Sequence, residues 1–264
     1  ILYKGQKIEG HFSDDAYHGI KLDFSYETKP LGTAGCVRQA MEGIDEPFVV
    51  ISGDAVCDFD LTKAIKLHKK RKADATIIVK KVDDPREYGL VSFDDEGRVL
   101  GFSEKPSYSG CVVDTANTGV YILSPSVLQL IPTGEQSDFA QNIFPLMLER
   151  DMELFAVQEE GYWCDIGDFQ SYIRCQRDVL AGKVSCEIEG TRFNNGSILQ
   201  SLLPVSVIAD GPVFVGKNVR VGEGTRLLKG TVVGDNTVIG SGCKLNGCVV
   251  HEGVHISDGV KINS

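Results

Sequence analysis

Residues 215–245 read VGKNVRVGEGTRLLKGTVVGDNTVIGSGCKL, and an aliphatic residue returns at every sixth position of this stretch. After the loss of one residue the series continues to the end of the chain, and its members are Val215, Val221, Leu227, Val233, Ile239, Leu245, Val250, Ile256 and Ile262. A six-residue period fits neither an α-helix nor a strand with two alternating faces, whereas it is typical of a hexapeptide parallel β-helix. Such coils usually wind left-handed, against the general right-handed crossover rule. The stretch therefore predicts a linker and a left-handed parallel β-helix over residues 183–264.

The first two thirds of the chain alternate strand-like and helix-like segments. Strands are expected at 20–26, 48–52, 75–82 and 119–123, a hairpin at 90–102 turning through 94–97, and helices at 33–42, 61–72, 139–150 and 169–181. Residues 48–52 form an apolar run that ends in Gly-Asp, as in a buried parallel strand. This alternation predicts a three-layer, Rossmann-like α/β sheet over residues 1–182, incomplete at its N-terminus, with ligands beyond the carboxyl ends of its strands.

Composition excludes several classes of protein. The chain has 264 residues, of which 42% are hydrophobic and 24% charged, as in ordinary globular proteins. Its net charge of −10 argues against a nucleic-acid partner, because phosphate backbones are bound mainly by clustered Lys and Arg. Neither a signal peptide nor an apolar run of membrane-spanning length occurs, so neither export nor membrane insertion is expected. The eight cysteines are scattered, without C-x-x-C or zinc-ligand spacing, which favours the reducing cytoplasm.

Two carboxylates are candidates for binding a metal ion. Asp54 follows an apolar strand and Gly53, so we expect it at the carboxyl edge of the sheet, although an aspartate there can simply cap a turn. Asp165 follows Gly161-Tyr162-Trp163, a stretch too aromatic for an ordinary loop. Two carboxylates from separate elements suit a hard octahedral cation such as Mg²⁺, which also takes phosphate oxygens.

Other polar segments have two open interpretations each. Lys105, between Glu104 and Pro106, can form a surface ion pair or supply a point charge to a phosphate. Asn117 precedes Thr118 and Gly119 at a strand start. It can be a turn residue or a ligand of sugar hydroxyls.

Three further features are also open to more than one interpretation. The small residues of 30–35 are expected to leave amides exposed at a helix N-terminus, which favours an anion or a base. Trp163 can be part of the core or wall a sugar site. His251 and His255 lie where hexapeptide acyltransferases place a base, but the long loop that accompanies such a base is absent from the sequence.

In combination these segments resemble the motifs of the sugar-nucleotide pyrophosphorylases, the nucleotidyltransferases that act on sugar 1-phosphates. The matching segments are 31–35, 53–54, 104–106, 117–119 and 161–167, and the likeness extends over residues 1–262. It is strongest to mannose-1-phosphate guanylyltransferases with a hexapeptide β-helix tail. The resemblance implies that a sugar 1-phosphate and a nucleoside triphosphate form a nucleotide-sugar, GDP-mannose, and pyrophosphate. A glucose-1-phosphate uridylyl- or thymidylyltransferase, or a non-catalytic sensing or assembly subunit on the same scaffold, remains open.

The resemblance also assigns roles to residues. Asp54 and Asp165 would hold the catalytic Mg²⁺, and Lys105 would bind the sugar phosphate. Contacts with the sugar and the nucleotide would come from Leu31, Gly32, Gly53, Gly89, Glu104, Asn117, Thr118 and Trp163, with Leu31 and Gly32 nearest the base.

The chain departs from the family pattern at its beginning. It does not contain the glycine-rich G-x-G-x-R-L segment that cradles the triphosphate in the family. This departure predicts that the chain alone has no pyrophosphorylase activity, and that it is either a fragment or a degenerate relative. The uncapped coil after Ile262 predicts truncation or a following domain. The flat coil faces also predict a homo-oligomer assembled through residues 205–264.

Overall fold

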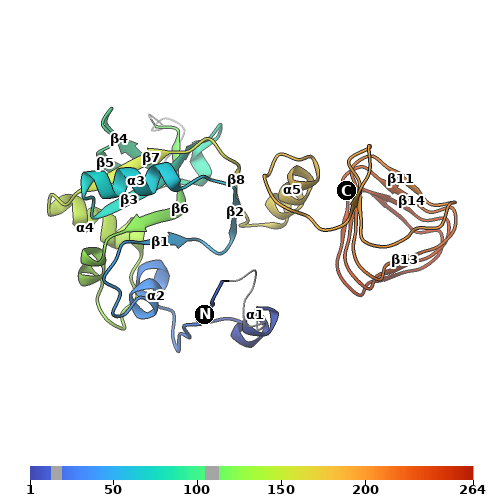
Figure 1. Ribbon diagram of the computed structural model, residues 1–264, viewed down its shortest axis with the longest axis horizontal. Coiled ribbons are helices and arrows are strands. Elements are labelled where there is room, and N and C mark those ends of the chain that lie inside the picture. The colour runs from blue at the N-terminus through green and yellow to red at the C-terminus, as the bar shows by residue number, and fades with distance from the viewer. Residues whose placement is uncertain (13–19, 105–112, 264) are drawn as a thin grey trace. The chain divides into compact units, whose positions relative to one another are not determined.

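A computed structural model describes residues 1–12, 20–104 and 113–263, with the Glu104 side chain outside the description. The chain forms two compact units (Figure 1). The first comprises Ile1–Gly53 and Asp60–Glu160, and the second comprises Asp54–Phe59 and Gly161–Ser264. The short segment that follows the first strand thus joins the unit formed by the C-terminal part of the chain.

A mixed six-stranded sheet organises the first unit. Its strands are β1 (Phe48–Ile51), β3 (Ala75–Lys81), β4 (Gly89–Phe93), β5 (Val99–Glu104), β6 (Thr115–Leu123) and β7 (Leu154–Gln158). The order is β5-β4-β6-β3-β7, and β1 also pairs with β6. Only the β3–β7 pair is parallel among the described ladders of this sheet. Residues 75–79 of β3 are buried, because β3 lies between β6 and β7 and has helices on both faces.

Helical segments cover both faces of this sheet. The helical segments of the first unit are α1 (Gly5–His11), α2 (Gly32–Ala40), α3 (Thr62–Arg71), the 3₁₀ turns η1 (Pro85–Glu87) and η3 (Pro125–Leu130), a π-helical turn η4 (Phe139–Ile143) and α4 (Phe144–Glu149), of which α1 and η1 bury no residue. Ile77 and Val79 share a core with residues of α2, η4 and α4. On the opposite face, Thr76 contacts His68 of α3 at 2.9 Å. These contacts confirm the expected layered α/β arrangement.

Two of the predicted strands are wrong in detail. Residues 20–26 form only a bridge at Ile20, and their apolar side chains Leu22 and Tyr26 are 39% and 45% exposed. β1 is neither buried nor parallel: it runs antiparallel to β6, and Val49 and Ile51 are 38% and 54% exposed. An apolar run of this length does not reveal strand direction, and one face of β1 lacks a covering layer in the described residues.

The second unit begins with a two-stranded ladder and a helix. β2 (Ala55–Cys57) pairs antiparallel with β8 (Trp163–Asp165), and α5 (Phe169–Leu180) follows. The remaining strands are short: β9 (Thr191–Arg192), β10 (Ile198–Leu199), β11 (Ile208–Asp210), β12 (Phe214–Val215), β13 (Arg220–Val221), β14 (Arg226–Leu228), β15 (Val232–Val233), β16 (Val238–Ile239), β17 (Lys244–Asn246), β18 (Val249–Val250), β19 (His255–Ile256) and β20 (Lys261–Asn263).

These strands form a parallel β-helix, which confirms the interpretation of the six-residue period. Three stacks, β10-β12-β15-β18, β13-β16-β19 and β11-β14-β17-β20, form the sides of the coil. Eight of the nine periodic aliphatic residues are buried, and Ile262 is partly buried against the same core. Phe214 pairs with Val232, eighteen residues later, whereas Val232 pairs with Val249, seventeen residues later. The lost residue therefore falls at the corner around Gly247, which has a φ of 64°.

Candidate functional site

The two carboxylates expected to bind metal lie at one end of the β2–β8 ladder. Asp165 pairs with Ala55, and the Ile166 amide donates to the Asp54 carbonyl oxygen at 3.0 Å. Both aspartates are exposed. The antiparallel pairing thus brings together two segments that are far apart in the sequence, as the predicted metal pair requires.

The chemistry of this pair suits Mg²⁺. Among residues 1–12, 20–104 and 113–263, no group of three or more His, Cys, Asp and Glu could enclose a metal ion. Mg²⁺ is usually held by one or two carboxylates, together with water and substrate phosphates, rather than by an all-protein cage. A pair of exposed carboxylates therefore fits Mg²⁺ better than it fits a structural metal.

Alternation along β8 separates a solvent-facing side from a helix-facing side. Trp163 and Asp165 share one face, since side chains two residues apart in a strand point the same way. Trp163 is half-buried, so its burial favours neither the interpretation as a core residue nor the interpretation as a wall of a sugar site. Cys164 is buried on the other face, with its Sγ 3.9 Å from the Ser171 carbonyl oxygen of α5.

A third nearby carboxylate belongs to the start of α5. The Ser171 amide donates to Asp168 Oδ1 at 2.7 Å, and the Asp168 amide donates to Ser171 Oγ at 3.1 Å. This reciprocal capping box fixes the first turn of α5 directly after Asp165. The hydrogen bond from the Ser171 amide lowers the pKa of Asp168, which keeps this carboxyl charged.

The Leu31–Gly35 loop differs from expectation. The Ala34 and Gly35 amides both donate to the Ser137 carbonyl oxygen, at 2.9 and 3.3 Å, so they are not exposed for an anion. Ser137 in turn donates its amide to the Leu31 carbonyl oxygen at 2.8 Å. Gly32 has a φ of 72°, and a Cβ there would lie 2.4 Å from the same Ser137 oxygen. The small residues of this loop therefore permit close packing against residue 137.

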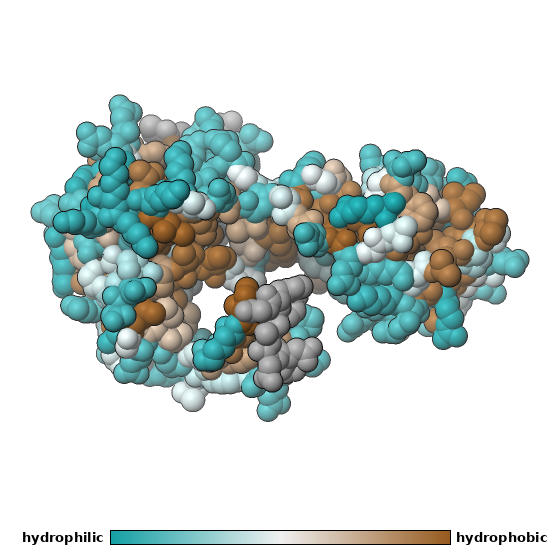
Figure 2. Space-filling view, in the orientation of Figure 1, coloured by the Kyte–Doolittle hydropathy of each residue, from teal (hydrophilic) through white to brown (hydrophobic). Residues whose placement is uncertain are grey.

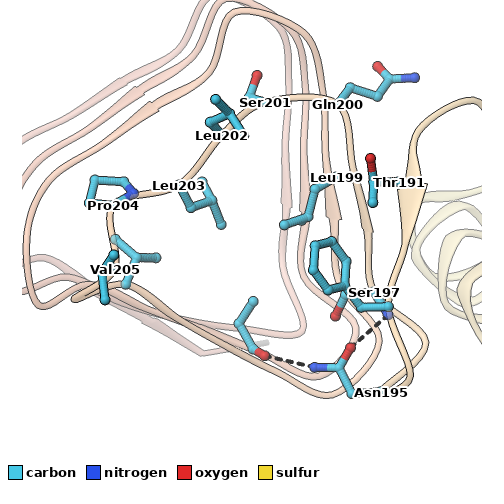
Figure 3. Close-up of a pocket in the computed structure, with 13 residues that line it drawn as sticks. Thr191, Asn195, Ser197, Leu199, Gln200, Ser201, Leu202, Leu203, Pro204 and Val205 are labelled. Carbon is cyan, nitrogen blue, oxygen red and sulfur yellow. Dashed lines mark hydrogen bonds between the residues drawn. The ribbon is translucent and has the colours of Figure 1, made fainter.

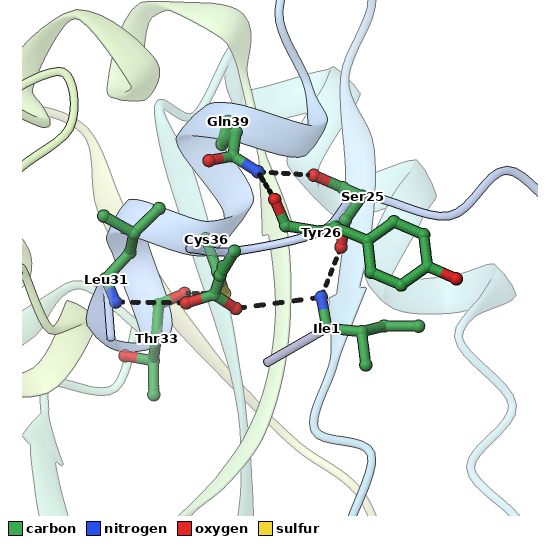
Figure 4. Close-up of polar contacts among 8 residues, drawn as sticks. Ile1, Ser25, Tyr26, Leu31, Thr33, Cys36 and Gln39 are labelled. Carbon is green, nitrogen blue, oxygen red and sulfur yellow. Dashed lines mark hydrogen bonds and ion pairs between the residues drawn. The ribbon is translucent and has the colours of Figure 1, made fainter. Parts of the chain in front are cut away.

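The same loop is held on its other side by the segment that precedes it. The Leu31 amide donates to Glu27 Oε2 at 3.0 Å, and Gln39 Nε2 of α2 donates to Ser25 Oγ and to the Tyr26 carbonyl oxygen, both at 2.9 Å (Figure 4). The Leu31 side chain is 4% exposed. The side chain of Leu31 is thus packed inside the protein, whereas Gly32, the first residue of α2, is partly exposed.

Asn117, Thr118 and Gly119 lie inside β6, which begins at Thr115 and not at Gly119 as expected. The pairing of β6 with β3 shifts at this point, because Val79 pairs with Asn117 whereas Ile78 pairs with Val120. Asn117 Oδ1 accepts the Gly119 amide at 3.1 Å, and Thr118 Oγ1 donates to the Ile78 carbonyl oxygen at 2.7 Å. The motif is thus a β-bulge, a device that re-aims side chains and is common beside active sites.

The bulge also lies close to the end of β1. Gly119 has a φ of 74°, and the Ser52 amide donates to its carbonyl oxygen at 3.0 Å. Burial raises the pKa of Tyr121 to about 12, while a hydrogen bond with the Asn117 side chain acts in the opposite direction. Asn117 therefore has structural partners as well as its predicted role toward a sugar.

The remaining candidates lie at two other places. Gly89 and Glu104 are paired across the β4–β5 hairpin, so two expected sugar contacts are neighbours in the backbone. Gly53 is exposed, with no atom within 4 Å of a Cβ built there. Lys105 and Pro106 lie outside the described residues.

Among the described residues, the second unit has two hollows that are not lined by Asp54 or Asp165. One, of about 430 Å³, opens at the first coil of the β-helix, where Leu199, Leu203 and Pro204 surround apolar space (Figure 3). The other, of about 820 Å³, lies between α5 and the β-helix and includes Phe169 and His251. Figure 2 shows hydrophobic surface exposed on the β-helix. The side chains of Leu202 and Val205 are fully exposed.

Comparison with known families gives two matches. Residues 3–182, more than half of the chain, match the family model described as nucleotidyl transferase. Residues 212–247 match the bacterial transferase hexapeptide model, which comprises six repeats. In the described residues, no helix has the length and apolar character needed to cross a membrane.

Individual relatives point to more than one substrate. A UTP–glucose-1-phosphate uridylyltransferase from Synechocystis is 33% identical over 240 residues, which cover 83% of this chain and 61% of that protein. A mannose-1-phosphate guanylyltransferase catalytic subunit beta from Drosophila pseudoobscura is 34% identical over 177 residues, which cover 66% and 47%. The chain thus spans about half to three fifths of the length of these relatives. The crystal structure of HddC from Yersinia pseudotuberculosis complexed with GMP-PN has a TM-score of 0.56 at 29% identity, covering 66% of this chain and 74% of that one.

Proposed function

The chain belongs to the nucleotidyl transferase family. We propose that it serves to convert mannose 1-phosphate and GTP into the nucleotide-sugar GDP-mannose, with release of pyrophosphate. The observation that carries this proposal is the pairing of β2 with β8, which places Asp54 and Asp165 side by side at an exposed ladder end. The resemblance to mannose-1-phosphate guanylyltransferases supports the choice of base and sugar.

The proposed reaction is a direct displacement at phosphorus. An oxygen of the sugar 1-phosphate attacks the α-phosphorus of the nucleotide and forms a new P–O bond. The bond from the α-phosphorus to the β,γ-phosphate breaks, and pyrophosphate leaves with the electron pair. No covalent enzyme intermediate is required, so the protein contributes mainly by positioning the reactants and offsetting charge.

Each predicted residue has a part in this proposal. Asp54 and Asp165 would hold Mg²⁺, which when bound supplies positive charge against the phosphate oxygens. Lys105 would hold the sugar phosphate as a point charge. The contacts with the sugar and base would come from Leu31, Gly32, Gly53, Gly89, Glu104, Asn117, Thr118 and Trp163.

A second candidate activity uses glucose 1-phosphate with UTP or dTTP. It is favoured by the uridylyltransferase relative, because that match covers 83% of this chain, whereas the guanylyltransferase match covers 66%. The two activities share the metal pair and the phosphate chemistry, and they differ in the groups that contact base and sugar.

Pyrophosphate release from matched substrate pairs tests the proposal. The full-length protein is incubated with Mg²⁺ and each combination of GTP, UTP or dTTP with mannose 1-phosphate or glucose 1-phosphate. Turnover that is highest with GTP and mannose 1-phosphate supports the proposal, and a preference for UTP and glucose 1-phosphate supports the second candidate. Tight binding of nucleotide-sugars without turnover of any pair would instead support a sensing subunit.

We also propose that the protein is a homo-oligomer whose contacts involve residues 205–264. The exposed apolar side chains of Val205 and Ile208, 105% and 49% exposed, support a contact at the first coil. Sedimentation velocity of the full-length protein with Val205→Asp and Ile208→Asp tests this proposal. Phe169→Asp is the matched control, since Phe169 is 87% exposed but lies outside the β-helix. A monomeric wild-type protein would overturn the proposal.

A further inference from the structure

The segment just after β2 contains a further aspartate, Asp58, whose two carboxylate oxygens accept backbone amides. Its amide donates to the Tyr162 carbonyl oxygen at 3.2 Å, and its Oδ1 accepts the Tyr162 amide. Its other carboxylate oxygen, Oδ2, accepts the Ser185 amide at 2.7 Å. One half-buried side chain therefore joins the end of β2, the start of β8 and the chain after α5.

The neighbouring glycine leaves room for this carboxylate. A Cβ at Gly161 would lie 2.6 Å from Asp58 Oδ1 and 3.0 Å from the Phe59 ring. Because the 2.6 Å separation is shorter than real Cβ contacts, a side chain at position 161 would displace the carboxylate. The close approach of residue 161 and the two hydrogen bonds of Asp58 are thus parts of one arrangement.

The ladder needs such an external restraint. β2 and β8 each have three residues, and a two-stranded ladder of this length is marginal on its own. A slip of one residue would turn each side chain to the opposite face. Asp58 and Tyr162 hold one end, while the Ile166–Asp54 hydrogen bond closes the other. The hydrogen bonds between Asp58 and Tyr162 therefore determine which residue of β2 pairs with Asp165.

We propose that Asp58 is a positioning residue, which fixes the β2–β8 register and thereby the relative placement of Asp54 and Asp165. It acts through the backbone at Tyr162 and Ser185 and contacts no reacting group. This inference rests on the proposed function for its catalytic consequence, whereas its structural part stands on the hydrogen bonds alone.

Kinetics of the full-length protein test the catalytic part. Asp58→Ala is expected to raise the Mg²⁺ concentration for half-maximal rate at least tenfold and to lower kcat at least tenfold. Asp58→Asn, which keeps one acceptor oxygen, should fall between wild type and Asp58→Ala. Gly161→Ala should produce the same shift in Mg²⁺ requirement although the carboxylate is retained. Asp60→Asn is the matched control, because Asp60 also accepts a backbone amide, that of Thr62, but outside the ladder.

Hydrogen exchange in the absence of substrate tests the structural part. Amides of 55–57 and 163–166 should exchange at least tenfold faster in Asp58→Ala and Asp58→Asn than in wild type or Asp60→Asn. Unchanged exchange, or a loss of kcat with an unchanged Mg²⁺ requirement in folded variants, would overturn the positioning role. If Asp58→Ala does not fold, Asp58→Asn and Gly161→Ala decide. A wild-type protein without turnover would contradict the proposed function alone, since the exchange comparison would still be decisive for Asp58.

Discussion

The guanidinium of Arg177 donates from Nη2 to the carbonyl oxygen of Gly247 at 2.9 Å. Arg177 lies in α5, and Gly247 forms the corner at which the six-residue period loses one position. A Cβ at this glycine would lie 2.9 Å from the same Nη2 atom. The tightened corner thus receives a helix side chain, and α5 is tied both to the β-helix and, through Cys164, to the strand that contains Asp165.

Replacing Arg177 should loosen this attachment. Arg177→Ala is expected to lower the free energy of unfolding by about 1 kcal/mol, a typical net value for one hydrogen bond. Chemical denaturation followed by circular dichroism measures the change. Arg226→Ala, at an exposed arginine of β14, is the control and should change stability by less than about 0.5 kcal/mol. Equal losses in the two variants would contradict the assignment.

The metal pair predicts a severe loss of activity with little loss of fold. Asp54→Asn and Asp165→Asn each remove one negative charge from an exposed position, so the thermal midpoint should remain near that of wild type. We expect at least a hundredfold lower kcat and a raised Mg²⁺ requirement in the full-length protein. Near-normal kcat with an unshifted Mg²⁺ dependence in either variant would eliminate that aspartate from the site.

Lys105 predicts a selective effect on one substrate. Lys105→Ala should raise KM for the sugar 1-phosphate at least tenfold and KM for the nucleoside triphosphate by less than threefold, because a point charge is lost at the sugar phosphate. Lys63→Ala, at an exposed lysine of α3, is the control. Equal changes in both KM values would show that Lys105 is not the sugar-phosphate ligand.

The buried His68 predicts a pH-dependent stability. Burial lowers the pKa of His68 below its usual 6.5. The nearby negative charge of Asp74 acts in the opposite direction, and the positive charge of Lys69 lowers the pKa further. The unfolded chain therefore binds a proton more readily than the folded one, so the stability present above pH 6.5 is lost as the pH falls below that value. Urea denaturation at about pH 7.5 and about pH 5.5 should show a smaller pH dependence for His68→Gln than for wild type. Parallel pH profiles would contradict this account.

The glycines that follow the inward aliphatic residues predict strong packing effects. A Cβ at Gly222 would lie 2.4 Å from the Ser241 backbone nitrogen of the next coil. Gly222→Ala is therefore expected to destabilise the protein by about 2 kcal/mol, in the range of overpacked cores. The control is Gly224→Asn at an open corner, because Asn218 and Asn236 adopt the same left-handed backbone at equivalent corners. Thermal unfolding of both variants distinguishes a packing effect at Gly222 from a general intolerance of the β-helix to glycine substitution.

The β-helix could be predicted from the sequence because its inward residues repeat at a fixed short period. β2 and β8 were not predicted as strands, because three residues give too little alternation to distinguish a strand from a loop. The roles of Ser137 and Asp58 depend on hydrogen bonds between segments remote in sequence, and no local pattern indicates them. The close approach of Gly161 to Asp58 likewise becomes evident only from the position of the Asp58 carboxylate.

The bulge at Asn117 shows a different limit of sequence reasoning. The sequence predicts a strand that starts at Gly119, with Asn117 as a turn residue or a sugar ligand at its start. The structure continues β6 through the Asn-Thr-Gly motif, since the Thr118 hydroxyl and the Asn117 side chain satisfy backbone groups that the shifted ladder leaves unpaired. The position of the motif inside a strand, as a bulge, is set by the pairing of β6 with β3, which no local pattern in the sequence indicates.

The shortened coil at Gly247 has a further consequence for the β-helix as a stack. A solenoid of identical coils has translational degeneracy, since sliding one coil along its neighbour reproduces the same contacts at another position. Here the step from Phe214 to Val232 is eighteen residues, and the step from Val232 to Val249 is seventeen. If one coil slid along the stack, a seventeen-residue repeat would lie against an eighteen-residue one. The residues at one corner, including its buried threonine or cysteine, would then no longer align with those of the neighbouring coil. The irregular repeat removes the degeneracy and leaves a single alignment of coils.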